Sequence, residues 1–381
     1  MATRRLGLIL SGVTGRIGVN QHLGRAVAAL RDSHLILANG DVLELDPVLV
    51  GRNAGKLRQI AARFNIDRWT TDLDAALSDR NDSVFFDSAL TGLRFDNVRR
   101  ALAAGKHVLC DKPLAPTYDE ALQLTRLAAE GNLRNGVMMA NLWLPGMRKL
   151  RTLVDAGFFG KVMRIRGEHG YWIFEGDQRP GQRPPWNYRK EDGGGIVLDM
   201  MCHWHYMIEP LFGRIRRVTC AARTFAPRRW DEAGTPYEAT ADDSAAVICE
   251  LESGALAQID LSWCTRVRRD DLMVMQVDGS GGSAVTGIFD CLSQHATQTP
   301  SLVWNAEDRA AADHRAAWMP VPDLPPLGNA FMVHWERFLR HVCDDQPFPW
   351  DFAMAARGIE IAEACYRSSA NYTWETLPGN G

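Results

Sequence analysis

Short apolar runs alternate with amphipathic helical stretches over the first 142 residues. The run at residues 6–10 (LGLIL) stops at a glycine-rich turn, and a helix-compatible stretch follows from Arg16 to about Arg31. Similar apolar runs occur at residues 47–50, 67–71, 83–89, 107–110 and 136–141. Stretches with the apolar spacing of helices, such as AGKLRQIAARF and YDEALQLTRLAAEG, separate most of these runs. Strands that alternate with such helices form a parallel sheet with right-handed crossovers, so residues 1–142 are predicted to be a doubly wound domain.

The pattern changes after Pro145. Strand-like segments follow one another through turns such as ESG and GSGG, at residues 161–173, 216–224, 244–251, 256–263 and 272–278. Two helical segments, AFMVHWERFLRHV and DFAMAARGIEIAEACYRSSA, come last. Residues 143–381 are therefore predicted to be an α+β domain with a large, mostly antiparallel open sheet, in a chain of the α/β class. Residues 175–192 are rich in Pro, Gly and charge, and their length predicts a functional loop.

The composition is that of a globular protein, with 46% apolar and 23% charged residues in a chain of 381. The formal net charge of -3 argues against a nucleic-acid or acidic-membrane partner, and no apolar stretch is long enough to span a membrane. The first apolar run is also too short for a secretion signal. The eight cysteines are scattered without a CxxC spacing, which favours reduced thiols in a cytoplasmic protein over disulfides or structural zinc.

The turn after the first predicted strand, SGVTGRIG, has the chemistry of a phosphate site. Glycines at this position allow backbone N–H groups to approach a pyrophosphate, and the helix N-terminus adds favourable partial charge. The alternative is that these glycines serve only the turn and its packing. The residues expected to contact a dinucleotide here are Gly12, Thr14, Gly15, Arg16, Ile17 and Gly18.

The second predicted strand ends in VLVGRN. Gly51 and Arg52 stand where an NAD enzyme usually has a carboxylate for the ribose 2′-hydroxyl, and an arginine there accommodates the 2′-phosphate of NADP. The sequence therefore favours NADP over NAD. The alternative is that Arg52 is a surface residue and the cofactor preference is open.

The fifth apolar run, HVLC, leads directly into Asp111, Lys112 and Pro113. Ligands of open α/β sheets bind outside the carboxyl ends of the strands, so Lys112 is predicted at the ligand edge, with its backbone restricted by Pro113. A partly desolvated lysine can lower the pKa of a bound hydroxyl or accept its proton. The alternative is an ordinary surface lysine at a strand end.

The segment GGGIVLDMMCHWHY, residues 193–206, carries a carboxylate and two histidines in an apolar helix. Asp199 and His203 are four residues apart and share one helix face. His203 and His205 are two apart and point to different faces, and no HExxH motif or Cys cluster supplies further ligands, so a metal is not expected. A buried structural pair of Asp199 and His203 is the remaining alternative.

Together, the glycine turn, the DKP sequence and the GGG, Asp199 and His203 pattern resemble the Gfo/Idh/MocA family of sugar and polyol oxidoreductases over nearly the whole chain. The resemblance implies a Rossmann domain that binds NAD(P), with Asp111 and Lys112 among the residues that contact the cofactor, followed by an antiparallel domain that forms dimers or tetramers. It assigns acid/base catalysis to His203, substrate binding and positioning of the histidine to Asp199, and assistance to Lys112. The residues themselves support these roles, because a histidine can take the hydroxyl proton as hydride leaves the carbinol carbon.

This chain departs from the family pattern near the predicted site. Asp111 stands in place of the usual Glu, Met201 in place of a frequent Gly, and Tyr206 in place of a frequent Asp. The family's NxRF-like stretch is altered to NLWLP, with Trp143 near the aromatic position. These changes leave the predicted chemistry intact but leave the substrate open.

Aromatic side chains suit the apolar faces of sugars, and polar ones read the hydroxyl groups. The residues predicted to contact substrate are Asp199, His203, Trp172, Trp186, Tyr188, Arg189 and Trp204. Packing in the core is the alternative for each aromatic residue. Arg189 and the cluster of Arg266, Arg268 and Arg269 recognise a substrate carboxylate or phosphate, or form a solvated edge.

The sequence thus predicts an NAD(P)-dependent oxidoreductase acting on a secondary carbinol or ketone of a sugar, glycoside or cyclitol. A second hypothesis is a glycosidase or lyase that oxidises its sugar transiently with tightly held NAD. A non-catalytic nucleotide-binding regulator ranks last, because Lys112, Asp199 and His203 are all present.

Overall fold

The computed structural model describes residues 2–173, 184–231, 233–301 and 313–378. The chain forms two compact units. The first comprises Met1–Ala140, Glu191–Gly193 and Leu327–Glu363, and the second Asn141–Lys190, Gly194–Pro326 and Ala364–Gly381. Part of the predicted functional loop, residues 174–183, lies outside the described residues.

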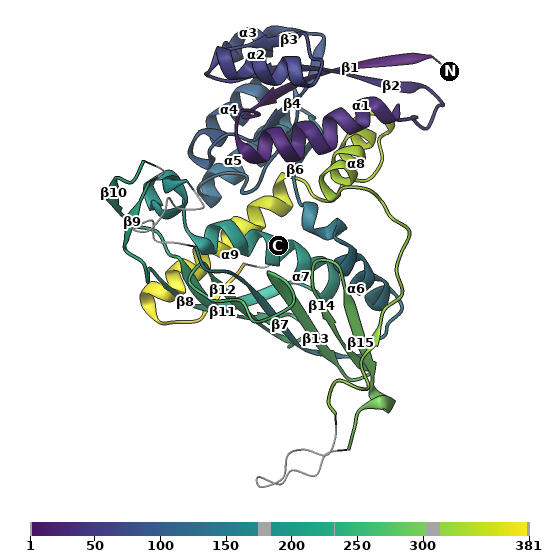
Figure 1. Ribbon diagram of the computed structural model, residues 1–381, viewed down its shortest axis with the longest axis vertical. Helices are drawn as coiled ribbons and strands as arrows, with labels where there is room; N and C mark the ends of the chain where they lie inside the picture. Colours follow the sequence, from purple (N-terminus) through teal and green to yellow (C-terminus); the bar gives the residue numbers. More distant parts are fainter. Residues whose placement is uncertain (1, 174–183, 232, 302–312, 379–381) are drawn as a thin grey trace. The chain divides into compact units, whose positions relative to one another are not determined.

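The first unit contains a six-stranded parallel sheet in the order β3-β2-β1-β4-β5-β6 (Figure 1). Its strands are β1 (Thr3–Ser11), β2 (Val42–Val50), β3 (Arg68–Thr70), β4 (Asp82–Asp87), β5 (His107–Cys110) and β6 (Asn135–Val137). The helices between them are η1 (Gly18–Ala28), α1 (Ala29–Ser33), α2 (Ala54–Arg63), α3 (Leu73–Ser78), α4 (Thr91–Ala103) and α5 (Tyr118–Glu130). The predicted doubly wound domain is confirmed. Strand order reverses beside β1, and in such sheets ligands bind at the carboxyl ends of the strands next to this point.

The helix expected from Arg16 to Arg31 differs in type from an ordinary α-helix. From Gly18 to Ala28 it is a π-helix, and it continues as α1. Apolar spacing in the sequence predicts a helix but does not distinguish the rare i→i+5 hydrogen-bond pattern.

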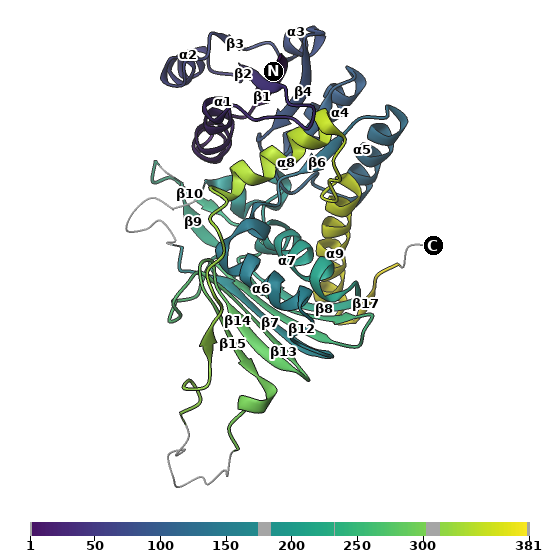
Figure 2. The same ribbon diagram turned by 90° about the vertical axis from the view of Figure 1, so that its right-hand side faces the viewer.

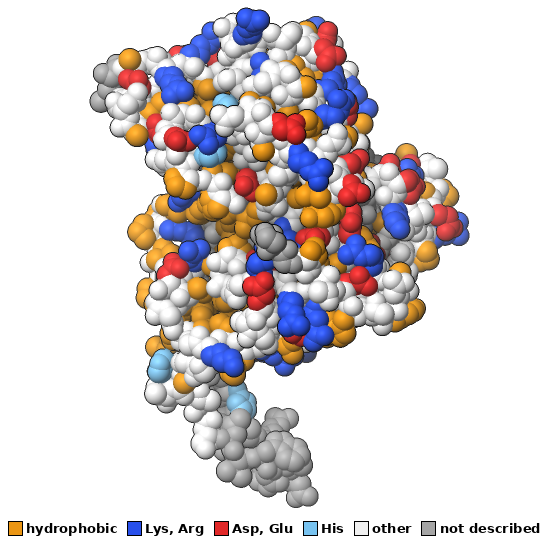
Figure 3. Space-filling view, turned by 180° about the vertical axis from the view of Figure 1, so that it is seen from behind, with side chains coloured by type: hydrophobic (Ala, Val, Ile, Leu, Met, Phe, Trp, Pro, Cys, Tyr) orange, Lys and Arg blue, Asp and Glu red, His pale blue; other side chains and the backbone are white. Residues whose placement is uncertain are grey.

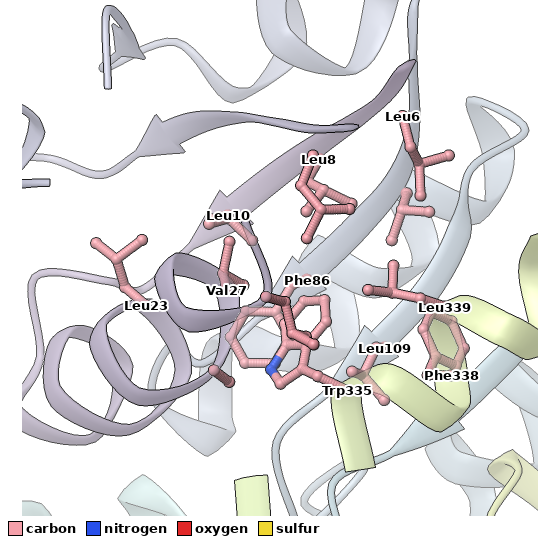
Figure 4. Close-up of a cluster of buried hydrophobic side chains, with 14 of the residues drawn as sticks. Leu6, Leu8, Leu10, Leu23, Val27, Phe86, Leu109, Trp335, Phe338 and Leu339 are labelled. Carbon is pink, nitrogen blue, oxygen red and sulfur yellow. The ribbon is translucent and has the colours of Figure 1, made fainter. Parts of the chain in front are cut away.

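Helix α8 (Ala330–Asp344) belongs to the first unit, so the predicted division into residues 1–142 and 143–381 is wrong for Leu327–Glu363. Its residues Trp335, Phe338 and Leu339 are fully buried and join the core formed with β1 and η1 (Figure 4). Burying each such side chain stabilises the fold by roughly 1.5–3 kcal/mol. A helix late in the chain therefore completes a core that begins at the first strand.

The second unit is built on a nine-stranded sheet in the order β16-β15-β14-β13-β7-β12-β11-β8-β17. These strands are β7 (Val162–Gly170), β8 (Ile215–Arg223), β11 (Ser244–Leu251), β12 (Leu256–Ser262), β13 (Met273–Gly279), β14 (Gly282–Thr286), β15 (Cys291–His295), β16 (Met319–Pro320) and β17 (Glu375–Thr376). Only β7 and β12 pair in parallel among them, which confirms the predicted mostly antiparallel sheet. A separate hairpin consists of β9 (Arg228–Trp230) and β10 (Pro236–Glu238). Strands β14 and β15 were not predicted, because they are short and rich in small or polar residues.

Helices α6 (Pro145–Asp155) and α7 (Ile196–Phe212) lie on one face of this sheet (Figure 2). Short 3-10 turns add to the described chain at η2 (Ala140–Trp143), η3 (Pro185–Tyr188), η4 (Lys190–Asp192) and η5 (Ala296–Gln298). The last helix, α9 (Phe352–Asn371), contributes residues 352–363 to the first unit and 364–371 to the second. Gly167 of β7 leaves room for the ring of Trp204 on α7, since a Cβ there would lie 2.4 Å from that ring.

The surface carries basic and acidic side chains interspersed over the face seen in Figure 3. All eight cysteines are free thiols. No helix in the described part of the chain is long and apolar enough to cross a membrane.

The N-terminus of α7 is buried, and distant residues accept its first hydrogen bonds. The Ile196 and Val197 N–H groups donate to the carbonyl oxygen and to Oδ2 of Asp242, at 2.9 and 2.8 Å. The Leu198 N–H donates to the Tyr366 hydroxyl at 3.3 Å, and that hydroxyl donates to Asp242 Oδ1 at 2.9 Å. Burial raises the pKa of Asp242, and burial with the nearby Asp242 charge raises that of Tyr366. These contacts replace the local cap that exposed helices use.

Gly195 makes this close approach possible. Its φ is +121°, and a Cβ would lie 2.5 Å from Asp242 Oδ1 and 2.6 Å from the Tyr366 hydroxyl oxygen. Gly213, at the other end of α7, has a φ of +98° with nothing within 4 Å of a Cβ position. Both glycines therefore need a positive φ, but only Gly195 has neighbours that leave no room for a Cβ atom.

We predict that Gly195→Ala lowers the free energy of unfolding by about 2–4 kcal/mol, and that Gly213→Ala lowers it by only about 1–2 kcal/mol. The difference arises because only the first substitution forces Asp242 and Tyr366 away from the helix N-terminus. Urea unfolding followed by tryptophan fluorescence measures both. Equal losses for the two variants would contradict this account of the helix start.

Candidate active site

The glycine turn after β1 is held against the chain that follows β4. Gly12 has a φ of +78°, and a Cβ there would lie 2.3 Å from the backbone carbon of Ser88. A Cβ at Gly18 would lie 2.5 Å from the carbonyl oxygen of Gly12, whereas at Gly15 the nearest atom is 3.4 Å away. A side chain at Gly12 or Gly18 would therefore collide with backbone atoms, whereas Gly15 has room for a Cβ atom.

The helix that follows this turn begins without a side-chain cap. Its first residues are Arg16 and Ile17, and the Val19 N–H donates at 2.9 Å to the carbonyl oxygen of Gly15, which has no side chain that could act as a cap. Thr14 and Ile17 are half-buried, and Arg16 is exposed. Backbone N–H groups at an uncapped helix start, beside glycines that admit no side chain, fit a dinucleotide pyrophosphate.

The carboxyl end of β2 carries Arg52 as an exposed side chain, next to half-buried Gly51. The following residue, Asn53, begins α2 by accepting a hydrogen bond from the Lys56 N–H at 3.0 Å. The amide side chain is thus used in the helix cap, and the side chain at the predicted ribose position is Arg52.

The carboxylate of Asp111, directly after β5, is held by donors on both oxygens. Oδ1 accepts the Lys112 N–H at 2.9 Å, and Oδ2 accepts the Ser88 hydroxyl at 3.3 Å and lies 3.4 Å from Nε2 of His22. Burial raises the pKa of Asp111, but the hydrogen bond with His22 and the charges of Arg94 and Lys112 lower it by more. On balance the pKa lies well below its usual value. Asp111 is therefore an ionised acceptor that fixes the chain leading to Lys112.

The other side of this chain is fixed by Arg94 of α4, which is 3% exposed. Its guanidinium donates to the carbonyl oxygens of Pro113 and Ala89 and to Oδ2 of Asp87. The peptide bond between Lys112 and Pro113 is cis. Lys112 is half-buried, between residues that are anchored on both sides.

Asp199 and His203 form the accessible stripe of α7. Both are half-buried, whereas every other residue from Ile196 to Ile208 is buried. The spacing of four residues places them on one face, as predicted. A helix that is otherwise enclosed therefore presents one carboxylate and one imidazole together.

The imidazole of His203 is oriented through Nδ1. This atom lies 3.2 Å from Nδ2 of Asn141 and also makes a hydrogen bond with the Tyr206 hydroxyl. Tyr206 is fully buried, and its ring meets that of His203 edge-on. A hydroxyl can donate or accept, so Tyr206 can partner Nδ1 in either protonation state of the ring.

The second histidine of the segment has a different partner. Nε2 of His205 lies 3.1 Å from Oε2 of Glu209, one turn along the helix, and His205 is 1% exposed. Oε1 of Glu209 accepts the Ile215 N–H, which ties the end of α7 to β8. Within the described residues, no group of three or more His, Cys, Asp or Glu side chains could hold a metal ion.

The predicted aromatic contacts divide into two groups. Trp204 and Tyr188 lie in the core, Trp204 fully buried and Tyr188 2% exposed between Arg229 and Trp263. Trp172 and Trp186 are half-buried. Packing, the alternative left open by the sequence, thus accounts for the positions of Trp204 and Tyr188.

The predicted arginines also have different surroundings. Arg189 lies over the Tyr237 ring at 4.9 Å, and Arg266 over the Trp172 ring at 4.1 Å. Arg269 pairs with Glu168 and donates to the carbonyl oxygens of Gly170 and Leu272, so it has a structural role, while Arg268 is exposed.

Sequence reasoning missed the residues that orient the predicted groups. Asn141 and Tyr206 had been noted only as members of altered family motifs, and they contact His203. Nothing in the sequence marked His22 or Asp242, because each meets its partner across a long stretch of chain. The sequence did single out Lys112, Asp199 and His203, and their catalytic roles stay predictions.

Comparisons with known proteins identify the family of the chain. Residues 12–139 match the model of an oxidoreductase family with an NAD-binding Rossmann fold, and residues 147–285 match the GFO/IDH/MocA C-terminal domain. D-Xylose dehydrogenase of Paenarthrobacter nicotinovorans is 43% identical over 365 residues, covering 94% of each chain. Levoglucosan dehydrogenase of Pseudarthrobacter phenanthrenivorans is 21% identical over 361 residues, covering 88% of this chain and 90% of the relative.

Solved structures show the same fold. Levoglucosan dehydrogenase in its apo form superposes with a TM-score of 0.82 at 20% identity, over 99% of this chain and 100% of the other. Its complex with NADH and levoglucosan gives a TM-score of 0.80 at 20% identity over the same shares. The structural likeness establishes only the fold, whereas the family models and the 43% identical relative establish the family. The chain is a sugar oxidoreductase of the Gfo/Idh/MocA family, with an NAD-binding Rossmann domain.

Proposed function

We propose that this enzyme oxidises the anomeric carbinol of an aldopentose of the D-xylose type to the lactone. The observation that carries the proposal is the accessible pair of Asp199 and His203, whose imidazole is oriented at Nδ1 by Asn141 and Tyr206. The identity of 43% with a D-xylose dehydrogenase over nearly the full length supports the substrate class.

His203 is proposed as the general base. Because Nδ1 is engaged by Asn141 and Tyr206, Nε2 is the atom assigned to the substrate hydroxyl. As the C–H bond breaks, its electron pair leaves as hydride, and the O–H proton passes to Nε2. The bound nicotinamide supplies the hydride acceptor. In this role Nδ1 carries a hydrogen throughout and donates it to the Tyr206 hydroxyl oxygen, with the oxygen of the Asn141 amide, rather than its NH2 group, facing the ring.

Lys112 is proposed to act on the hydroxyl group that reacts, and Asp199 on neighbouring hydroxyl groups of the sugar. A protonated lysine stabilises the developing alkoxide and lowers the pKa of the hydroxyl. The Asp199 carboxylate accepts hydrogen bonds from sugar hydroxyls, one helix turn before His203. Trp172, which is half-buried, is proposed to contact an apolar sugar face, and the exposed Arg266, which lies over its ring, a hydroxyl.

The proposal is tested with purified enzyme, NAD or NADP, and a substrate panel of D-xylose, its epimers, levoglucosan and an inositol. We expect the reduced nicotinamide to accumulate fastest with an aldopentose. Turnover restricted to the anhydrosugar or the cyclitol would refute the pentose assignment. An aryl xyloside added to this panel tests the transient-oxidation hypothesis, which would be supported by cleavage of the xyloside without net reduction of the cofactor.

The protein is proposed to assemble as a dimer or tetramer and to reside in the cytoplasm. The sheet face opposite α7 exposes Ile248, Leu256 and Leu292 by 40%, 47% and 41%, which supports self-association through that face. Eight free thiols support a reducing compartment.

We predict that His203→Ala lowers kcat by about 10²–10⁴-fold and leaves the Kd for the cofactor within about twofold, because only proton transfer is removed. The matched control is His205→Gln, two residues away on the same helix, where an amide still donates to Glu209. Its kcat should stay near that of the wild type. Steady-state kinetics and fluorescence titration of the cofactor measure both quantities; an active His203→Ala enzyme would rule out the assigned base.

We propose that the cofactor preference is for NADP, with Arg52 contacting the 2′-phosphate. Arg52→Ala should then lower kcat/KM for NADP by about 10–100-fold, the loss expected for a hydrogen bond between charged groups, and leave NAD nearly unchanged. Arg63→Ala at the far end of α2 removes the same charge about 15 Å away along the helix and should affect neither cofactor. If Arg52→Ala changes both cofactors alike, Arg52 has no role in selectivity.

A further inference from the structure

A buried histidine lies behind the carboxylate that precedes Lys112. His22, in the π-helix η1, is 1% exposed, and its Nε2 is 3.4 Å from Oδ2 of Asp111. π-Helical geometry is rare and often accompanies functional sites. The described chemistry assigns this histidine no role, since it belongs neither to the glycine turn nor to α7.

Trp335 of α8 determines which ring nitrogen of His22 carries the proton. Its indole Nε1 lies 3.2 Å from Nδ1 of His22. An indole N–H can only donate, so Nδ1 must accept. The ring proton of the neutral imidazole is then on Nε2, the atom that faces Asp111. Figure 4 shows the indole of Trp335 in the buried cluster between β1, η1 and α8.

We call the chain of hydrogen bonds from Trp335 through His22 to Asp111 the relay, and aromatic rings enclose it. The ring of Phe86 lies 4.4 Å and that of Phe331 5.0 Å from the His22 ring, centroid to centroid. Trp335 is fully buried. Hydrogen bonds shielded from water in this way are electrostatically stronger and more directional than exposed ones.

The relay reaches Lys112 through the carboxylate. Oδ2 of Asp111 faces His22 and Ser88, and Oδ1 accepts the Lys112 N–H. With donors on both oxygens, the carboxylate has one favoured rotation. Loss of the His22 donor leaves only the Ser88 hydroxyl among these contacts to oppose rotation away from the Lys112 N–H.

We propose that His22 and Trp335 are positioning residues for Lys112, with Trp335 fixing the His22 tautomer, His22 orienting Asp111, and Asp111 orienting the Lys112 backbone. This inference rests on the catalytic role proposed for Lys112. It adds two residues from the first helix and from α8 to the set on which turnover depends.

The test compares His22→Leu, which has no donor, with His22→Gln, whose amide can still donate to Asp111. We expect kcat of the Leu variant to fall by about 10–100-fold with the KM for the cofactor unchanged, and the Gln variant to recover to within about threefold of the wild type. Trp335→Phe keeps an aromatic ring but removes the N–H, and its kcat should fall by about 3–10-fold. Equal kcat values for the Leu and Gln variants would overturn the proposal.

A spectroscopic measurement separates positioning from packing. Long-range nitrogen–proton correlation of the imidazole, assigned by the loss of its signals in His22→Gln, should show the His22 proton on Nε2 in the wild type and a mixture of tautomers in Trp335→Phe. Phe338→Leu, on the same helix and in the same core, is the packing control and should lower stability without changing the tautomer or kcat. A proton on Nδ1 in the wild type would refute the relay.

Lys112→Ala separates this inference from the proposed function. If Lys112→Ala retains wild-type kcat, the catalytic role proposed for Lys112 is refuted, and the positioning role proposed for His22 and Trp335 is refuted with it. If Lys112→Ala is inactive while His22→Leu and Trp335→Phe keep wild-type kcat, the role of Lys112 stands and only the relay is refuted.

Discussion

Helix α7 begins inside the protein, and its first N–H groups must be satisfied without water. Asp242 and Tyr366 provide the acceptors, and Gly195 allows the helix to approach them closely. Unsatisfied buried N–H groups would cost about 1–3 kcal/mol each. The same constraint fixes the axis and rotation of the helix, so Asp199 and His203, within its first two turns, acquire a defined direction.

In the first unit, Lys112 is also positioned by buried polar side chains that anchor the residues on either side of it. Lys112 lies between Asp111 and Pro113, which are hydrogen-bonded to His22 and to Arg94 respectively. In both units, a candidate catalytic side chain on a regular element or at its end is held by buried polar groups. Such support gives a site the precision that proton transfer requires, because a shift of an ångström at the reacting atoms lowers the rate severely.

The sequence predicted the parts of this protein that depend on local order. Alternating strands and helices, the Gly12 turn and the spacing of Asp199 and His203 are periodic or short-range features, and they were confirmed as structure. The sequence assigned α8 to the second domain, because its apolar face could cover either sheet, and only the three-dimensional core shows that it packs against the first. The contact of Asn141 with His203 also appears only in the structure, because the two residues are 62 positions apart in the sequence.

Direct hydride transfer from the sugar is the central claim about this enzyme, and isotope transfer tests it most directly. The measurement uses D-xylose carrying deuterium at the anomeric carbon, with mass spectrometry of the reduced nicotinamide. The account predicts that the deuterium appears in the reduced cofactor, with the lactone as the sugar product. Deuterium released to water, or a cofactor reduced without the label, would contradict it.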